Sequence, residues 1–553
     1  MKNIRNSLIG GALLALSAVA LSTAGQAQPV LDRTDPTQEE ERGDAVPQLD
    51  NAADPTLTAE QGRDLALDGE TFAVGAIVID GARALTPRDF VDIIQDYSAR
   101  PVTGEELNTL ADRIAGRARE RGFVFATATI APQSLDTGVL RVRLDEGRID
   151  EIRIDGDDDA ALRAQLAPLL DGGPATLDRI ERQILLADDL AGVYVRRSRF
   201  EREGDRGILI VEAFRSRYSG TIELENDGSQ PIGPLRARLD FDANALLTPF
   251  DELDVTLSTV PLQPEELQFA KASYGMVVNS AGTQITAIGS YSATEPGAYL
   301  ADRDIFGESW RAEIEISHAV VRSRNISVWA QASAELRDLR QERDGRLARH
   351  DRIPVVRASL YSIARVLGGA MRGKITVSQG LDMFGATQEG DPLASRRDAP
   401  ADFSSLSGWL EWETGLFGDV SLELGGRGQI AATPLLTTED IGLGGTRFLR
   451  GYNFSERTGD NGVMGYGELR YDWVDPFLGI RNFELYAYAD GGLADNLEDG
   501  RGGGSLASSG GGIRTEITRD LDFDVEVAVP LTGPRYDTDD MSPRFNIRLR
   551  QSF

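Results

Sequence analysis

The chain has no cysteine among its 553 residues, so it can form no disulfide and offers no thiolate for catalysis or for binding a soft metal. Histidine is nearly absent as well. Only His318 and His350 occur, and they lack the spacing of a helical zinc site. A metal centre would therefore depend on carboxylates alone. We expect no cofactor, no metal site and no catalytic residue, and thus a protein that is not an enzyme.

Long hydrophobic segments are also missing. Beyond the N-terminus, no run of about eighteen uncharged apolar residues occurs, which excludes a membrane-spanning helix from that part of the chain. The mean hydropathy is −0.26. Any part of the chain that crosses a membrane must therefore do so as β-strands.

The N-terminus has the features of a secretory signal peptide, which we assign to residues 1–27. Lys2 and Arg5 precede an apolar stretch, Leu8–Leu21, and small residues follow at Gly25 and Ala27. The alternative is a permanent anchor helix, but the apolar stretch is short and ends in the small-residue pattern of a cleavage site. We expect the mature protein to leave the cytoplasm.

Basic residues are outnumbered by acidic ones, with 58 Lys and Arg against 88 Asp and Glu, and the net charge is −30. Such a surface repels a phosphate backbone, so nucleic acid is not an expected partner. The acidic residues occur in both halves of the chain. They would either line a pore and loops that bind divalent cations, or simply solubilise a loop-rich surface.

Residues 28–70 are polar and contain proline, which is typical of a linker. Thr58 and Gln61 have the spacing of a helix capping box, so this linker could hold a short helix that plugs a pore, or only a nascent helix.

Two copies of a β-α-α-β-β unit follow, over residues 71–147 and 148–215. In the first copy we predict a strand at 77–79, helices at 86–97 and 103–121, and strands at 125–131 and 139–144. In the second we predict a strand at 149–154, helices at 159–170 and 176–191, and strands at 194–201 and 207–213. The repeated order indicates two small α+β domains in tandem.

From residue 216 to 553 apolar and polar residues alternate in segments separated by glycine-containing turns. One face of such strands can meet lipid and the other can meet water. We count about eleven segments before Arg450 and five after it, an even total of about sixteen, as expected for a closed antiparallel barrel. A soluble β-sandwich array or solenoid is the competing architecture.

Short motifs in both parts resemble one family. The two small domains resemble polypeptide-transport-associated (POTRA) domains through Arg121-Gly122-Phe123, Ala131-Pro132-Gln133 and Asp145-Glu146-Gly147-Arg148-Ile149. The barrel segment Leu449-Arg450-Gly451-Tyr452 resembles the sixth extracellular loop motif of the two-partner secretion transporters (TpsB), the ShlB/FhaC/HecB-type haemolysin secretion/activation proteins of the POTRA-barrel superfamily. Tyr488-Ala489-Asp490-Gly491-Gly492 resembles the motif of their thirteenth strand.

The resemblance implies a specific site. The loop near residues 440–462 would fold back into the pore, and Asp490, flanked by Tyr488 and Gly492, would receive the guanidinium of Arg450. The strand alternation agrees with this, because Asp490 has the same parity as Glu484 and the opposite parity to Leu485, and should therefore face the lumen.

The resemblance also implies a function. Periplasmic POTRA domains, in which the client-binding residues are unknown, would bind an unfolded exoprotein that carries an N-terminal secretion domain. The barrel, set in outer-membrane lipid by the barrel assembly machinery, would pass that exoprotein outward. Two alternatives stay open: a barrel or autotransporter assembly factor that inserts outer-membrane proteins, and a passive porin or surface-binding barrel.

Overall fold

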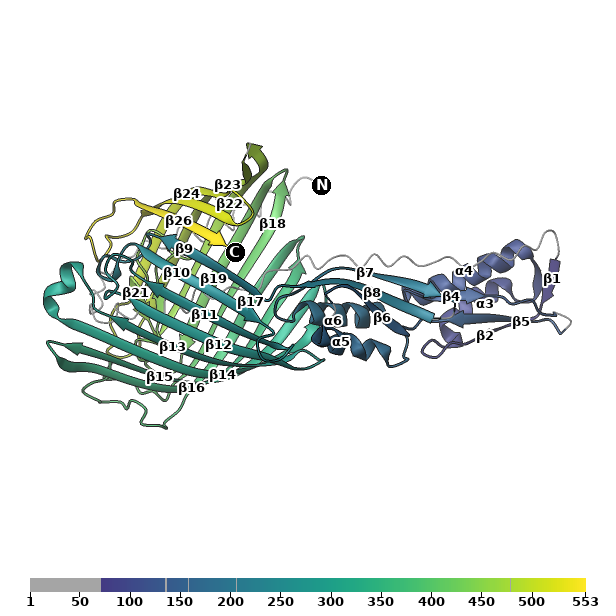
Figure 1. Cartoon of the computed structure of the whole chain (residues 1–553), viewed down its shortest axis with the longest axis horizontal. Helices are drawn as coiled ribbons and strands as arrows, with labels where there is room; N and C mark the ends of the chain where they lie inside the picture. The colour runs from purple at the N-terminus through teal and green to yellow at the C-terminus, as the bar shows by residue number, and fades with distance from the viewer. Residues whose placement is uncertain (1–70, 135–136, 158, 205, 478) are drawn as a thin grey trace, which may run out of the picture.

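The computed structural model describes residues 71–134, 137–157, 159–204, 206–477 and 479–553. The predicted signal peptide, linker and plug helix lie outside these residues. No helix in the described ranges is long and apolar enough to cross a membrane. Two small domains extend in line from one end of a large β-barrel (Figure 1).

The first domain is a three-stranded sheet covered by helices. Its elements are β1 (Thr71–Val74), β2 (Ala76–Asp80), η2 (Pro87–Phe90), α3 (Val91–Tyr97), β3 (Arg100–Thr103), α4 (Gly104–Glu120), β4 (Thr127–Thr129) and β5 (Val139–Asp145). The sheet has the order β2-β5-β4, with β2 parallel to β5, and β1 pairs separately with β3. The β1–β3 pair was not predicted from the sequence.

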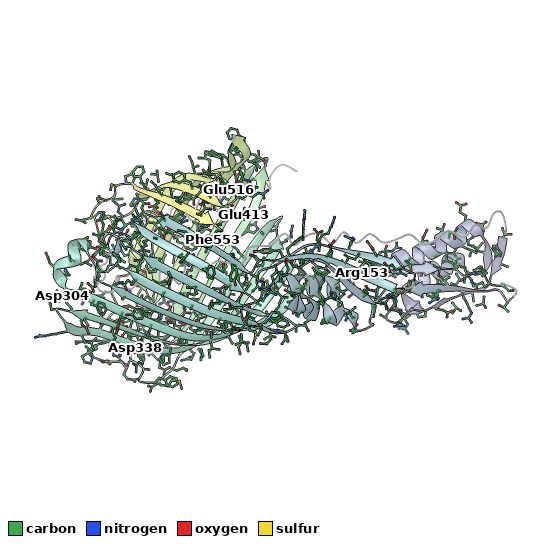
Figure 2. The ribbon with its side chains drawn as sticks, in the orientation of Figure 1. Arg153, Asp304, Asp338, Glu413, Glu516 and Phe553 are labelled. Carbon is green, nitrogen blue, oxygen red and sulfur yellow. The ribbon has the colours of Figure 1, made fainter. Side chains whose placement is uncertain are left out.

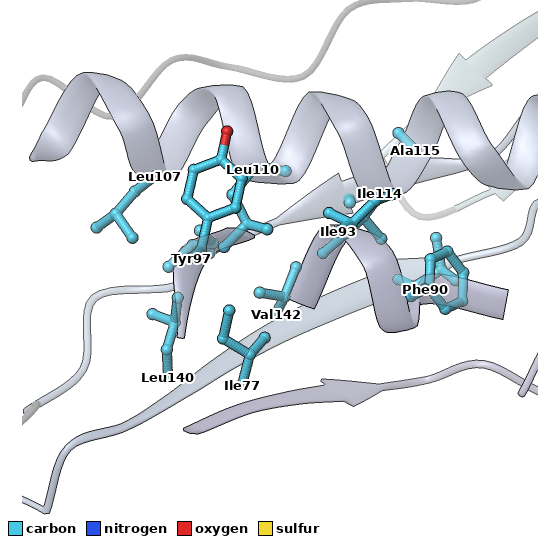
Figure 3. Close-up of a cluster of buried hydrophobic side chains, with 14 of the residues drawn as sticks. Ile77, Phe90, Ile93, Tyr97, Leu107, Leu110, Ile114, Ala115, Leu140 and Val142 are labelled. Atoms are coloured by element: carbon cyan, nitrogen blue, oxygen red, sulfur yellow. The ribbon is translucent and has the colours of Figure 1, made fainter. Parts of the chain in front are cut away.

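Helix α4 shows why this domain folds as it does. Thr103 caps its first turn and Glu106 bonds back to the Thr103 backbone, which completes a capping box. Leu107, Leu110 and Ile114 then recur on one face and pack on the sheet, as Figure 3 shows. The domain therefore has an apolar core of its own.

A buried carboxylate closes the end of the first domain. The side chain of Glu146 is 4% exposed and accepts hydrogen bonds from the backbone N–H groups of Arg83, Ala84 and Leu85 at 2.8 to 3.1 Å. These donors would otherwise have no partner in the turn after β2. Glu146 thus fixes the connection between the sheet and the first helix.

The second domain repeats the order of the first. Its elements are β6 (Glu151–Gly156), α5 (Ala160–Leu166), η3 (Ala167–Leu170), α6 (Leu177–Asp188), β7 (Val193–Glu203) and β8 (Arg206–Arg215), and its sheet has the order β6-β8-β7. The strand predicted at 125–131 is shorter than expected, because Phe125 packs in the core of this second domain and stacks on Phe200 at 3.6 Å between ring centroids. The two domains are therefore joined by a shared aromatic contact.

Sixteen antiparallel strands form the closed barrel, eleven before the Arg450 segment and five after it, as the sequence predicts. They are β9 (Tyr218–Glu225), β10 (Arg236–Asn244), β11 (Asp251–Thr259), β12 (Gln268–Asn279), β13 (Thr283–Thr294), β14 (Ile305–Arg322), β15 (Ile326–Arg343), β16 (Arg346–Val366), β17 (Gly369–Gly380), β18 (Ser404–Phe417), β19 (Val420–Ala431), β22 (Asn461–Phe477), β23 (Ile480–Asp495), β24 (Gly504–Glu516), β25 (Leu521–Pro530) and β26 (Arg544–Ser552). The last strand closes the barrel by pairing with the first, from Arg548↔Glu225 to Ser552↔Thr221.

The two faces of the barrel wall differ as the alternation requires. On β22 and β23 the outward residues Leu469, Leu485 and Leu493 are exposed, whereas the inward residues Glu468 and Asp490 are buried. A sheet with an apolar outer face and a polar inner face suits a wall between lipid and water.

The barrel has a proximal end, next to the small domains, and a distal end. Connections at the proximal end are short turns, whereas long segments at 381–403 and 432–460 occupy the distal end, together with η4 (Gln230–Ile232) and η5 (Ala298–Arg303). Figure 2 shows Asp304 at the distal end and Arg153 on the second domain.

The second domain is docked on the proximal turns. The side-chain amides of Gln165 and Gln183 each donate to the carbonyl of Ser280 at 3.0 Å, and Arg322 pairs with Asp189 at 2.6 Å. A Cβ at Gly282 would lie 2.4 Å from the side chain of Leu186, so α6 packs directly on the turn between β12 and β13. These contacts set the angle between the second domain and the barrel.

Candidate functional site

The segment between β19 and β22 turns back into the barrel. Its base is a short hairpin, β20 (Ile441–Leu443) with β21 (Arg457–Gly459), and residues 444–456, which we name the pore loop, lie between these two strands. Leu449 and Tyr452 at the tip are fully buried against side chains of the barrel wall. The pore loop therefore occupies the lumen.

The backbone of the pore loop depends on glycine at its first turn. Gly444 and Gly445 have φ angles of +109° and +125°, and a Cβ at Gly444 would lie 2.0 Å from the carbonyl oxygen of Asn453. Leu449 also has a positive φ, +57°, which is unfavourable for a leucine. Complete burial of its side chain offsets that cost.

Arg450 lies at the centre of the site and is 5% exposed. Its guanidinium Nη1 is 2.7 Å from Glu468 Oε2 on β22 and 3.4 Å from Glu526 Oε2 on β25. The guanidinium carbon lies 3.3 Å from the ring centroid of Tyr488 on β23, a cation–π contact. The side chain is thus held by three strands of the wall.

Asp490 lies beside Arg450 and contacts both its side chain and its backbone. Its Oδ2 accepts the backbone N–H of Arg450 at 3.1 Å and stands 3.7 Å from Nε, while its other oxygen accepts the hydroxyl of Ser508. The guanidinium itself reaches past Asp490 to the longer side chain of Glu468. Asp490 therefore fixes the backbone of the loop and forms the longer ion pair with the guanidinium, whereas Glu468 forms the shorter one.

Glu468 binds more than one arginine. Its second oxygen, Oε1, accepts from Arg470 Nε at 2.7 Å and from Arg514 Nη1 at 2.8 Å. Glu468 therefore belongs to a network of charges on the lumen wall, and the pore loop adds Arg450 to this network.

Gly451 and Tyr452 complete the motif. The N–H of Gly451 donates to Ser508 Oγ at 3.1 Å, and a Cβ there would lie 2.8 Å from the Cβ of Ser508 and 2.9 Å from the nitrogen of Pro530. The hydroxyl of Tyr452 accepts the N–H of Thr532 at 3.2 Å, and its carbonyl accepts from Arg544 at 2.9 Å. Only glycine fits at position 451 against β24 and β25.

Gly492, the last residue of the strand motif, makes room for the loop. A Cβ at this position would lie 2.8 Å from the Cβ of Met464 and 3.2 Å from Cδ1 of Leu449. The glycine therefore leaves the space that the Leu449 side chain fills.

A second arginine of the pore loop contacts another part of the wall. Arg447 pairs with Glu411 on β18, which also accepts from Arg372 Nε at 2.6 Å. The Arg447 guanidinium lies 5.8 Å from the ring centroid of Trp409, and its side chain is 43% exposed. Sequence reasoning missed this pair, because no motif marks Glu411.

The arrangement fixes the position of a loop inside the barrel. Within the ranges that the structure describes, no group of three or more His, Asp or Glu residues could hold a metal ion. The contacts of Arg450 and Gly451 hold a segment that fills the lumen.

Comparisons with known proteins identify relatives of this architecture. A family model described as haemolysin secretion/activation protein ShlB/FhaC/HecB matches residues 204–515, and one described as POTRA domain, ShlB-type, matches residues 72–147. The outer membrane transporter CdiB of Dickeya dadantii (strain 3937) is 22% identical over 520 residues, 90% of this chain and 89% of the relative. The heme/hemopexin transporter protein HuxB of Haemophilus influenzae (strain 86-028NP) is 21% identical over 402 residues, 69% of each. The solved structure of CdiB from Escherichia coli has a TM-score of 0.75 and 19% identity, covering 95% of this chain and 99% of that one, and so has the same fold.

Proposed function

Because the protein belongs to the haemolysin secretion/activation protein family ShlB/FhaC/HecB, we propose that it recognises an unfolded exoprotein in the periplasm and secretes it through its barrel. The family resemblance, the N-terminal POTRA domain and the barrel of sixteen strands predicted from the sequence are confirmed. The barrel lies in the outer membrane with the small domains on the periplasmic side. The distal end of the barrel is therefore extracellular.

The small domains offer edges on which a client can pair. In the second domain, β6 and β7 are the edge strands of the sheet, and β7 runs over eleven residues from the barrel towards the first domain (Figure 1). An extended client segment can add to such an edge through backbone hydrogen bonds. We propose that the client, which would carry an N-terminal secretion domain, is held in this way before it enters the barrel.

The observation that carries the proposal is the pore loop in the lumen, held by Arg450. A client cannot pass while this segment fills its path, so secretion requires the loop to move. The Arg450 contacts are ionic and cation–π interactions on one side chain, which can be broken together and re-formed. The loop therefore acts as a removable plug, which a passive porin does not need.

No nucleotide-binding motif occurs in the sequence, so transport would be driven by the client. Folding of the client outside the cell would prevent it from sliding back. The family consists of secretion proteins and not of enzymes, and we expect transport without catalysis. We further propose that the barrel assembly machinery inserts this protein in outer-membrane lipid.

The test is to delete the gene in its host and to compare secreted and outer-membrane proteins by quantitative mass spectrometry, with plasmid complementation as the control. Loss of one or two large secreted proteins, with other barrels unchanged, is the expected result. Broad depletion of outer-membrane barrels would instead support an assembly factor, and no change in either fraction would refute both functions.

A further inference from the structure

An ion pair at the extracellular base of the pore loop lies outside the motif described above. Asp460 directly precedes β22 and is 0% exposed, and Arg396 belongs to the segment 381–403 and is 9% exposed. Arg396 Nη1 lies 2.8 and 2.7 Å from the two carboxylate oxygens of Asp460. The two residues are 64 positions apart, and two complete barrel strands, β18 and β19, lie between them in the chain. We name this pair the clasp.

The clasp also binds two other extracellular segments. Asp460 accepts the backbone N–H of Leu435 at 2.6 Å, on the segment 432–440, and that of Leu497 at 2.7 Å, on the segment 496–503. Both oxygens of the carboxylate thus bind a backbone N–H as well as the arginine. A carboxylate with this many donors holds its neighbours firmly, because each donor would lack a partner if the carboxylate left.

Arg396 uses its remaining donors in the same region. Nε donates to Asp398 at 2.9 Å, and Nη2 donates to Asp398 at 3.0 Å and to the carbonyl of Leu497. A Cβ at Gly500 would lie 2.5 Å from Nη2, so the backbone of the segment 496–503 packs on the guanidinium itself. The planar fork of an arginine can make all of these contacts at once, and a lysine cannot.

The clasp therefore joins three extracellular segments, 381–403, 432–440 and 496–503, which together we name the outer cover. The segment 432–440 precedes the pore loop and its base hairpin in the chain, and Asp460 follows them. The hydrogen bond from Leu435 to Asp460 therefore holds the two ends of the loop together. An apolar cluster, which includes Phe403, Leu435 and Leu436, packs two of these segments, 381–403 and 432–440, against each other.

We infer that Arg396 and Asp460 are positioning residues that hold the pore loop from the outside, independently of Arg450 on the inside. In this arrangement two sets of contacts fix the loop, those of Arg450 on the inner side of its base hairpin and those of the clasp on the outer side. Breaking the Arg450 contacts frees the tip, but the loop leaves the lumen only when the clasp also opens. The inference rests on the proposed role of the pore loop as a plug.

The test uses the absence of cysteine, since one introduced thiol is then a unique label. Ser455 is buried in the pore loop and its hydroxyl has no hydrogen-bond partner within the described residues, so Ser455→Cys changes little. In this background the full-length protein in outer membranes is treated with a membrane-impermeant maleimide. We expect slow labelling of the parent and a rate about tenfold higher in Arg396→Gln, because charged hydrogen bonds are lost.

Asp460→Asn should increase labelling more than Arg396→Gln, because it also disturbs the bonds to Leu435 and Leu497. The double variant should label no faster than Asp460→Asn alone, since both changes open one clasp. Arg396→Lys keeps the charge without the fork and should fall between the parent and Arg396→Gln. Heat-modifiable gel mobility reports whether each variant has assembled. If Asp460→Asn fails to assemble, Arg396→Lys still tests the clasp.

Arg322→Gln is the matched control. Arg322 is also a largely buried arginine, with 12% of its side chain exposed, but it pairs with Asp189 of the second domain at the proximal end of the barrel. Labelling at the parental rate is expected there. Parental labelling in Arg396→Gln, Arg396→Lys and Asp460→Asn would overturn the clasp. Because labelling needs no client, that outcome is separate from a failure of the secretion test.

Discussion

Arg450→Ala should free the tip of the pore loop while the barrel stays assembled. The substitution removes the contact with Glu468 at 2.7 Å, the weaker one with Glu526 at 3.4 Å, and the cation–π contact with Tyr488. The barrel strands keep their own hydrogen bonds, since Arg450 belongs to none of them. The change therefore acts on the loop and not on the wall.

The structure limits the size of the effect. Removing one partner of a buried ion pair costs about 3 to 5 kcal/mol when the other charge is left alone. Glu468 is not left alone, because Arg470 and Arg514 still bind it. We therefore take the lower end, about 3 kcal/mol, which raises the population of the undocked tip roughly 100-fold.

Two measurements check this prediction. In planar bilayers, Arg450→Ala should show larger or more frequent open-channel currents than the parent, because the tip no longer fills the lumen continuously. In cells it should reduce export of the client, because the Arg450 contacts can no longer re-form and return the loop to its docked position. Arg550→Ala is a suitable control. This arginine of β26 pairs with Glu223 on β9, across the seam where the last barrel strand meets the first, and no contact with the pore loop is found among the described residues.

A double-mutant cycle identifies the partner. If the guanidinium acts through Glu468, the combined effect of Arg450→Ala and Glu468→Gln will be smaller than the sum of the single effects. Strict additivity would show that the two side chains are not coupled. Parental conductance and parental export in Arg450→Ala, with normal assembly, would refute the reasoning.

Three further predictions concern the loop and the first domain. Arg447→Ala should loosen the loop less than Arg450→Ala, because the side chain is half-exposed and surface-like pairs contribute about 0 to 1 kcal/mol; channel currents should rise only slightly. Gly451→Ala should prevent docking of the tip altogether, because a Cβ at this position would collide with β24 and β25. Thiol labelling at Ser455→Cys should therefore rise more in Gly451→Ala than in Arg447→Ala or Arg450→Ala. The Arg117 guanidinium lowers the pKa of Asp92 to about 2. The ionised Asp92 carboxylate should therefore stabilise the fold above its unfolded pKa of 3.8, and this stabilisation should be lost as the pH falls towards 2. The melting temperatures of the parent and of Asp92→Asn should accordingly differ at neutral pH and become equal in acid.

The order of elements could be predicted from the sequence because it depends on local periodicity. Alternation of apolar and polar residues is a property of each strand alone, and the division of eleven strands before the Arg450 segment and five after it follows from counting them. The strand at 125–131 was predicted too long, because where it begins depends on packing between domains and not on local periodicity. Phe125 packs in the neighbouring domain, and periodicity carries no information about which core an apolar residue joins.

The site could be predicted only in part. Strand parity places Asp490 and Glu468 on the lumen side, but it does not tell which carboxylate an arginine on a folded-back loop will reach. That choice depends on the length of each side chain and on the path of the loop. The contacts of Arg447 with Glu411 and of Arg396 with Asp460 join residues 36 and 64 positions apart, without a motif at either end, and only the folded chain brings them together.

The pairing of β26 with β9 has a consequence for how the protein is made. Arg548 and Glu225, paired across the seam, are 323 residues apart in the chain. Until the last strand has been synthesised, the first one has an unpaired edge, and such an edge can join a foreign strand. Closure also requires β9 and β26, at the two ends of the barrel sequence, to meet, and forming a contact between such distant segments is slow. Throughout this interval the nascent chain needs something to shield that edge, so its passage to the membrane is the stage at which it is most vulnerable to aggregation.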